Sequence, residues 1–140
     1  MMGRPSKMTP KVTAEICRRL AEGESLRKVC KSEEMPDKTT VLRWLRENAE
    51  FRTQYVHARE DQADHFVDEC IDIADDGKND TYVDDEGNTK TDYDVIARSR
   101  LRVDARKWAA GKLNPKKYGD KITQEVINHP PPITDADLIA

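Results

Sequence analysis

The chain has few of the residues that build a large hydrophobic core. Only 36% of its 140 residues are apolar and 6% are aromatic, whereas 36% are charged. A chain of this length makes one domain or two small ones, and this composition argues against a large globular core. We therefore expect extended helices and self-association, because contacts between copies bury apolar surface that one copy leaves exposed.

Cysteines are few, and long apolar runs are missing. Cys17, Cys30 and Cys70 form no CxxC pair, and each lies in an apolar helical row. Their odd number and spacing favour reduced core residues of a cytosolic protein. No apolar run approaches the ~18 residues of a membrane span. No signal peptide is recognisable, so we expect a cytoplasmic location and no membrane contact.

Motifs of catalysis and cofactor binding are also missing. The sequence has no Gly-rich phosphate loop with Lys-Ser/Thr, no Ser or Cys nucleophile pattern and no carboxylate cluster in a nuclease setting. His57, His65 and His129 are scattered. His65 shares a helix face with Asp61 and Glu69, where salt pairing is favoured over metal binding. We expect no enzyme activity, no cofactor and no metal site.

The net charge of −3 hides a segregation of charge along the chain. Residues 1–59 carry 13 Lys and Arg against 8 Asp and Glu, residues 60–94 carry 2 against 14, and residues 95–140 carry 9 against 5. The N-terminal segment is therefore basic although the whole chain is acidic. A basic segment of this kind is typical of a nucleic-acid contact.

Residues 23–48 have the pattern of two short helices joined by a tight turn. Ser25 is a suitable cap for the first helix, Pro36 interrupts the pattern and Asp37 is a suitable cap for the second. The apolar residues expected to face inward are Leu26, Val29 and Cys30 in the first helix, and Val41, Leu42 and Leu45 in the second. Trp44 lies off this stripe and is expected to pack against the preceding helix or to face a partner.

This spacing is that of a helix-turn-helix, whose second helix enters the major groove of DNA by its N-terminal residues. That helix offers Lys38, Thr39, Thr40, Arg43 and Arg46. The arginine fork fits guanine O6 and N7 or a pair of phosphates. A three-helix bundle with a solvated polar face has the same apolar pattern, but the composition of the exposed face favours DNA.

The first residues are basic and contain Gly3-Arg4-Pro5, which is similar to a minor-groove arm. A disordered start is the commoner explanation of such a segment. Thr9 and Pro10 then begin a supporting helix that ends at Gly23. Together these segments predict a DNA-binding domain over residues 1–48.

Residues 49–113 predict a helical core for oligomerisation. A long helix runs from Ala49 to about Asp76, a β-hairpin covers residues 78–93, and a second helix, capped by Asp94, covers residues 94–113. The seam of the first helix contains Phe51, Tyr55, Phe66, Cys70 and Ile73. The residues of the second helix expected to face inward are Ile96, Leu101, Ala105, Trp108 and Ala109. The carboxylates of the hairpin lack the spacing of a calcium loop.

The two long helices carry matching charges. An edge of Arg98, Arg102 and Arg106 matches an acidic run of Asp61, Asp64, Asp68, Asp72 and Asp75. We therefore expect antiparallel packing, with charges paired across the joint or between subunits. A two-helix hairpin buries little apolar area by itself, so Phe66, Ile73, Leu101 and Trp108 are expected to mediate homo-oligomerisation.

Residues 114–140 predict a C-terminal strand and tail. Asn114-Pro115 ends the second long helix, and a basic turn is expected over residues 116–121. A short strand over residues 122–127 would need partners from adjacent subunits in an intersubunit sheet or barrel. The proline-rich end is of a kind that is usually disordered and orders on a partner.

The sequence resembles the small subunits of tailed-phage terminases over most of its length. The resemblance lies in GRPSK, in SLRKVCKSEEMPDKTTVLRWLREN followed by EFRTQYVHAREDQADHF, and in RLRVDARKWAAGKLNPKKYGDK, which is the most specific stretch. It implies a DNA-binding N-terminal domain, a helical core that assembles into a ring, and C-terminal strands around the ring axis. Glu33-Glu34, directly before the second helix, departs from an all-basic DNA face and would repel phosphate.

The resemblance also implies a role. Such a subunit binds the packaging-start site on concatemeric double-stranded phage DNA in the host cytoplasm. It delivers this DNA to the large terminase subunit, which carries the ATPase and nuclease. By the motif match, the DNA contacts fall on Lys38, Thr39, Thr40, Arg43 and Arg46, with Arg4 and Lys7 flanking. Residues after Ile127 would contact the large subunit.

Three other hypotheses use the same features. A helix-turn-helix transcription regulator would act as a twofold dimer on a palindromic site. A transposase fragment would need a carboxylate triad and metal-dependent cleavage. A structural ring component would have a vestigial helix-turn-helix.

Overall fold

The structure is a computed structural model that describes Arg4 and residues 7–120. This part of the chain contains α1 (Pro10–Ala21), α2 (Leu26–Val29), α3 (Lys38–Glu47), α4 (Ala49–Asp75), β1 (Thr81–Val83), β2 (Thr89–Thr91), α5 (Tyr93–Leu113) and α6 (Pro115–Tyr118). The mainly helical architecture with one small β-hairpin agrees with the prediction. The strand expected over residues 122–127 and the tail after it lie outside the described residues.

Each of the first four helices begins at a side chain that accepts a hydrogen bond from its first turn, where backbone N–H groups have no partner inside the helix. The acceptors and donors are Thr9 Oγ1 and Val12 N at 3.3 Å, Ser25 Oγ and Lys28 N at 3.1 Å, Asp37 Oδ1 and Thr40 N at 2.8 Å, and Asn48 Oδ1 and Phe51 N at 2.8 Å. The predicted caps Thr9, Ser25 and Asp37 are confirmed.

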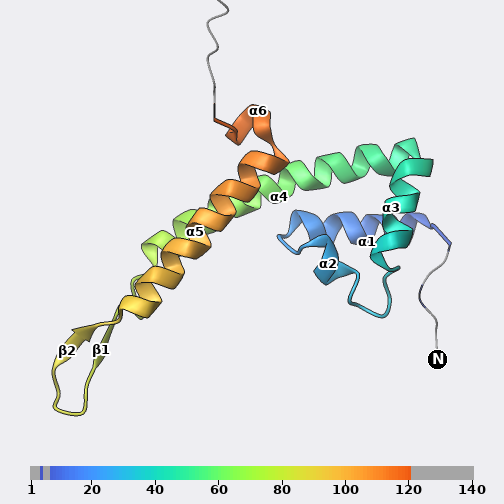
Figure 1. Cartoon of the computed structure of the whole chain (residues 1–140). Coiled ribbons are helices and arrows are strands. Elements are labelled where there is room, and N and C mark those ends of the chain that lie inside the picture. The colour runs from blue at the N-terminus through green and yellow to red at the C-terminus, as the bar shows by residue number, and fades with distance from the viewer. Residues whose placement is uncertain (1–3, 5–6, 121–140) are drawn as a thin grey trace, which may run out of the picture.

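One core lies between α1, α2, α3 and the N-terminal half of α4 (Figure 1). Its buried residues are Ile16, Leu20, Leu26, Val29, Cys30, Met35, Val41, Trp44, Phe51 and Ala58. The predicted inward face of α3 was wrong at one position, because Leu42 is 40% exposed and Trp44 only 4% exposed. The Trp44 ring packs edge-on against Phe51, with ring centroids 6.5 Å apart, and this contact seats α3 on α4.

The C-terminal half of α4 leaves this core and pairs with α5 in an antiparallel helical hairpin (Figure 1). We call the surface along which α4 and α5 pack together the joint. In the joint, the Cys70 thiol donates to the Val103 carbonyl at 3.6 Å, and Arg106 Nε donates to Glu69 Oε2 at 2.6 Å. Ile73 and Ala110 are buried beside them. Of the predicted arginine edge, only Arg106 makes an ion pair across the joint among the described residues.

Two predictions about α5 were wrong. The helix begins at Tyr93 and is capped by Asp92, whose Oδ1 accepts from Val95 N at 3.2 Å, and Asp94 lies inside its first turn. The expected inward stripe points outward: Ile96, Leu101 and Trp108 are 40%, 55% and 68% exposed. Ala105 is exposed and Ala109 is half-buried.

The face of α5 that is turned toward α4 is instead formed by Val95, Ser99, Val103, Arg106 and Ala110. α5 thus carries two candidate faces, and the weaker apolar one meets α4. The sequence pattern does not distinguish the two, because both recur with the helical period.

The ends of this helical hairpin are closed in different ways. At the far end β1 and β2 pair with Tyr82 opposite Lys90, and Gly87 lies in the turn with a φ of +82°. At the other end α6 replaces the basic turn that was predicted. Pro115 suits the first position of a helix. Lys117 and Tyr118 of α6 both donate hydrogen bonds to Asp64 Oδ1 of α4.

Candidate nucleic-acid interface

The outer side of α3 presents a set of exposed cations. Lys38, Thr39, Arg43 and Arg46 are exposed, and Thr40 is half-buried. Among the described residues, no ion pair involves Lys38, Arg43 or Arg46. Their charged groups are therefore available to phosphates or base edges.

Asp37 sets the start of this helix. The hydrogen bond from the Thr40 backbone N–H holds the pKa of the Asp37 carboxyl below its ordinary value, and the nearby charges of Arg4 and Arg43 lower it further. The ionised carboxylate occupies the Thr40 N–H. It thereby satisfies one of the backbone N–H groups that the first turn of α3 leaves without a helical partner.

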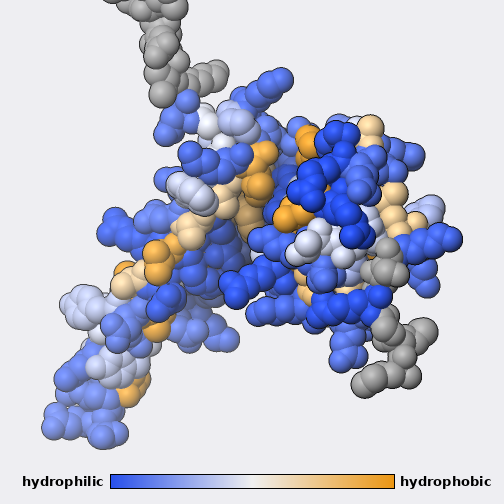
Figure 2. All heavy atoms as spheres, turned by 45° about the vertical axis from the view of Figure 1, so that its right-hand side comes forward, coloured by the Kyte–Doolittle hydropathy of each residue, from blue (hydrophilic) through white to orange (hydrophobic). Residues whose placement is uncertain are grey.

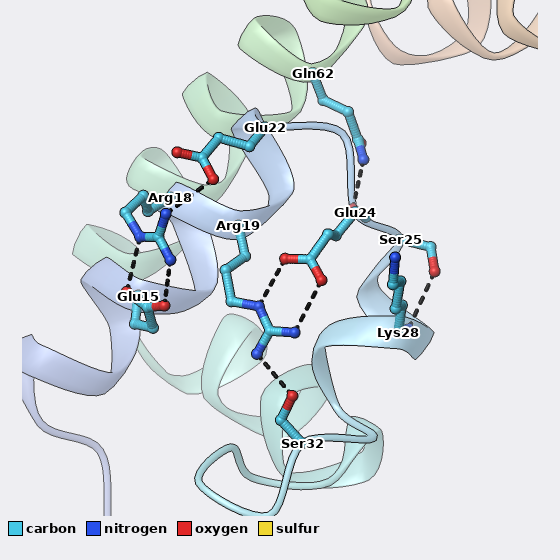
Figure 3. A network of polar contacts seen from close by, with 9 residues as sticks. All are labelled: Glu15, Arg18, Arg19, Glu22, Glu24, Ser25, Lys28, Ser32 and Gln62. Atoms are coloured by element: carbon cyan, nitrogen blue, oxygen red, sulfur yellow. Dashed lines mark hydrogen bonds and ion pairs between the residues drawn. The ribbon is translucent and has the colours of Figure 1, made fainter.

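The turn between α2 and α3 is fixed by two arginines from other parts of the chain. Arg4 Nη1 donates to the Cys30 carbonyl at 2.7 Å, where α2 ends. Arg19 of α1 pairs with Glu24, with Nε 2.7 Å from Oε2, and donates to Ser32 Oγ at 2.8 Å (Figure 3). Arg19 thus holds both ends of the α2 segment against α1.

The turn between α1 and α2 is held against α4. Gln62, which is 1% exposed, donates from Nε2 to the Glu24 carbonyl at 2.7 Å (Figure 3) and accepts from Arg59 at 2.6 Å. Gly23 has a φ of +102°, and a Cβ built there would lie 2.6 Å from His65 Cδ2. The helix-turn-helix is therefore clamped to α4 through backbone and side-chain contacts.

The two flanking candidates from the N-terminal segment are placed differently. The Arg4 side chain is exposed, but it is bonded to the end of α2, and its charge contributes to lowering the pKa of Asp37. This places Arg4 beside the start of α3. Lys7 is exposed, just ahead of α1.

A further group of exposed cations, on and just after α2, was not among the predicted contacts. Arg27, Lys28 and Lys31 are exposed, whereas Leu26, Val29 and Cys30 are buried. In a helix-turn-helix the first helix crosses the DNA backbone, so these cations would add phosphate contacts. The apolar period that places Leu26 and Val29 inside also places these cations outside, and this signal was available in the sequence.

The four residues predicted to mediate oligomerisation divide into two pairs. Ile73 is buried in the joint between α4 and α5, and Phe66 is half-buried with its ring 6.5 Å from that of His65. Leu101 and Trp108 are exposed. Only the second pair is fully available to another copy.

The described residues offer little for other chemistry. They contain no group of three or more His, Cys, Asp or Glu residues placed to hold a metal ion. Burial raises the pKa of the Cys17, Cys30 and Cys70 thiols, which disfavours the nucleophilic thiolate. A hollow of about 420 Å³ between α1 and α4 is lined by apolar and polar residues in equal number, with Met8 and Phe51 among the first and Glu50 and Gln54 among the second. In the part of the chain that the structure describes, no helix is both long enough and apolar enough to span a bilayer.

Comparison with known proteins gives consistent results. The family described as "Bacteriophage Sf6, terminase small subunit-like" matches residues 8–125. Three crystal structures of point mutants of the terminase small subunit gp1 of the bacterial virus Sf6 are similar to this chain. They cover 89% of this chain and 87% of their own, with 44%, 44% and 45% sequence identity and TM-scores of 0.67, 0.66 and 0.67. No curated protein matches.

Proposed function

This chain belongs to the bacteriophage Sf6 terminase small subunit-like family, and on that basis we propose that it is the DNA-recognition subunit of a viral DNA-packaging motor. It binds the packaging-start site of concatemeric double-stranded phage DNA. As a homo-oligomeric ring it presents this DNA to the large terminase subunit and regulates that ATPase and nuclease in the host cytoplasm. The chain itself is not an enzyme in this proposal.

The observation that carries the proposal is the row of exposed cations on α3, which form no ion pair with any other residue that the structure describes. Lys38, Arg43 and Arg46 are exposed on a helix whose opposite side is buried by Val41 and Trp44. Cations without an acidic partner are what contact with a phosphate backbone requires, since they displace condensed counterions. Thr39 and Thr40 at the start of α3, with Arg4 and Lys7 flanking, complete the proposed contact set.

The proposal divides the chain into three parts. Residues 1–48 bind DNA, residues 49–113 form the oligomerisation core, and residues 114–140 contact the large subunit. One helix-turn-helix offers only a few phosphate contacts, so a single copy would bind weakly. A ring multiplies the contacts and raises the effective concentration of each unit at the DNA.

The test is DNA binding by fluorescence anisotropy, with duplexes from the phage genome at low and moderate salt. Lys38→Ala, Arg43→Ala and Arg46→Ala should each weaken binding and reduce the slope of log affinity against log salt. Lys78→Ala is the matched control, because Lys78 is an exposed cation just after the far end of α4. It should leave binding unchanged.

Unchanged affinity in Lys38→Ala and Arg43→Ala at low salt would show that α3 is not the recognition helix. Native mass spectrometry of the wild type tests the ring in the same samples. A twofold dimer on a palindromic site would instead support the transcription-regulator hypothesis.

A further inference from the structure

An apolar stripe runs along α5 on the side turned away from α4. Ala97, Leu101, Ala105 and Trp108 recur at i, i+4, i+8 and i+11, and all four are exposed. Leu101 precedes the joint residue Val103 by two positions, and Trp108 precedes the buried Ala110 by two. Two positions are about 200° around an α-helix, so the stripe lies opposite the joint. Figure 2 shows a row of apolar spheres along the helical hairpin with hydrophilic spheres on both sides.

Cations line both edges of this stripe. Arg98 and Arg102 lie on one edge, and Arg100 and Lys107 lie on the other. All four are exposed, and none takes part in an ion pair within the described part of the chain. Asp104 is the one carboxylate between Arg98 and Lys112. We call the stripe and its two cationic edges the basic face.

α4 carries a face of the opposite charge. Its exposed carboxylates Asp61, Asp68, Asp72 and Asp75 recur at i, i+7, i+11 and i+14, beside Ile71, which is 60% exposed. Asp68 and Asp72 each lie two positions from the joint residue Cys70, so this row too lies opposite the joint. None of the four carboxylates is in an ion pair among the described residues. We call this row together with Ile71 the acidic face.

The acidic face is unfavourable within one chain. Asp68 and Asp72 are spaced i, i+4, and Asp72 and Asp75 are spaced i, i+3, so that like charges repel along the helix. The last turn of α4 has no basic residue, although the negative end of the helix dipole favours cations there. A cationic surface packed on this side would remove both costs.

We propose that copies of this chain join head to tail, with the basic face of one copy packed on the acidic face of the next. Contact between two basic faces would bring arginines together, and contact between two acidic faces would bring carboxylates together. Only the mixed contact pairs opposite charges around a shared apolar strip, which Trp108, Leu101 and Ile71 supply. The inference rests on the proposed function, because it names the surfaces that build the ring.

The arrangement of the two faces also determines the symmetry. Because they lie on opposite flanks of the helical hairpin, one neighbour cannot cover both, and each copy requires two neighbours. Repeated contacts between unlike surfaces close into a ring or extend as a filament, whereas a twofold dimer would leave one pair of faces open.

The test measures mass in solution by light scattering and native mass spectrometry. One variant reverses the acidic face by Asp61→Lys, Asp68→Lys, Asp72→Lys and Asp75→Lys. A second reverses the basic face by Arg98→Glu, Arg100→Glu, Arg102→Glu and Lys107→Glu. Each should lose the oligomer and run as a monomer, because every joint then pairs like charges. Mixed in equal amounts, the two should recover an oligomer of more than two copies, since every joint pairs opposite charges again.

Controls separate this effect from loss of folding. Asp85→Lys with Glu86→Lys changes exposed carboxylates at the hairpin tip and should leave the mass unchanged. Circular dichroism should report wild-type helix content in both face variants. If a fourfold variant does not fold, the single change Ile71→Lys is the substitute, and it should also lower the oligomer mass.

The outcomes are distinct. A wild-type oligomer that survives either reversal, or a mixture that stays monomeric, would overturn the head-to-tail contact and leave the DNA-binding proposal standing. A wild type that is monomeric throughout would overturn the contact directly. An oligomer that behaves as expected but ignores duplex DNA would overturn the proposed function and keep the contact.

Discussion

At the scale of single residues, Gly23 determines how closely the α1–α2 turn approaches α4. Gly23→Ala should lower the free energy of unfolding by about 3 kcal/mol, because it adds left-handed strain and a Cβ against His65. His65 cannot retreat without disturbing its contact with Glu69, where Nε2 lies 2.6 Å from Oε1. Urea unfolding followed by circular dichroism measures the loss.

Gly87→Ala is the matched control for this change. Gly87 also has a positive φ, +82°, but nothing lies within 4 Å of a Cβ built there. Gly87→Ala should therefore lower the free energy of unfolding by only about 1 kcal/mol, which is the cost of placing a residue with a Cβ in the left-handed conformation. Equal losses for the two variants would show that the contact with His65 is unimportant.

Asp37 gives a residue-scale prediction about pH. Its folded pKa is depressed, chiefly by the Thr40 N–H. The charged cap therefore adds stability above the ordinary carboxyl pKa, about 3.9, and this stability is lost as the pH falls through the folded pKa. Asp37→Asn keeps an acceptor but does not titrate. At neutral pH the wild type should have a higher free energy of unfolding than Asp37→Asn, and this difference should disappear as the pH is lowered. A stability difference that does not change with pH would show that the charge of the Asp37 carboxylate is not its cause.

Glu33 and Glu34 give a residue-scale prediction about affinity. Both are exposed in the turn before α3, where their charge opposes an approaching phosphate. Changing both to Gln should raise DNA affinity about two- to fivefold at low salt, and less at high salt because of screening. Glu86→Gln at the hairpin tip is the control and should change nothing. Anisotropy titrations at two salt concentrations measure the effect.

At the scale of elements, the two tryptophans have different surroundings. Trp44 is 4% exposed and seats α3 on α4, whereas Trp108 is 68% exposed on the outer side of α5. Trp44→Ala should cost about 4 kcal/mol of stability and abolish DNA binding with it. Trp108→Ala should change the stability of the dilute monomer by less than about 0.5 kcal/mol but weaken assembly. Unfolding and sedimentation at matched concentrations separate the two effects.

At the scale of the whole molecule, the exposed cations of α2 and α3 would bind DNA and the helical hairpin of α4 and α5 would join the copies in the proposed assembly. If the ring supplies avidity, an assembly variant that keeps the charge unchanged, Leu101→Ala with Trp108→Ala, should bind a long duplex about 100-fold or more weakly than the wild type. It should also show a shallower salt dependence. The control is a short duplex that admits one helix-turn-helix, for which the two proteins should bind equally. Equal binding to the long duplex would mean that single copies suffice.

The sequence by itself determined where α1 to α5 lie and three of their caps, whereas the cap of α5 and the short helix α6 were not predicted. Thr9, Ser25 and Asp37 cap helices through hydrogen bonds within a single turn, and the hairpin near Gly87 depends on local turn chemistry. The exposed cations of α3 follow from the helical period once the buried side of the helix is known. Such features involve residues close in the chain, so local patterns are sufficient to predict them.

Only the tertiary structure decided which faces meet. In α3, Trp44 is buried and Leu42, which was expected to face inward, is exposed. In α5, the strongest apolar stripe is exposed, and Val103 and Ala110 lie on the side that faces α4. The clamp from Gln62 to Glu24 joins residues 38 positions apart and has no local signature. Two faces of one helix can both recur with the helical period, and the choice between them depends on the shape and charge of the surface they meet.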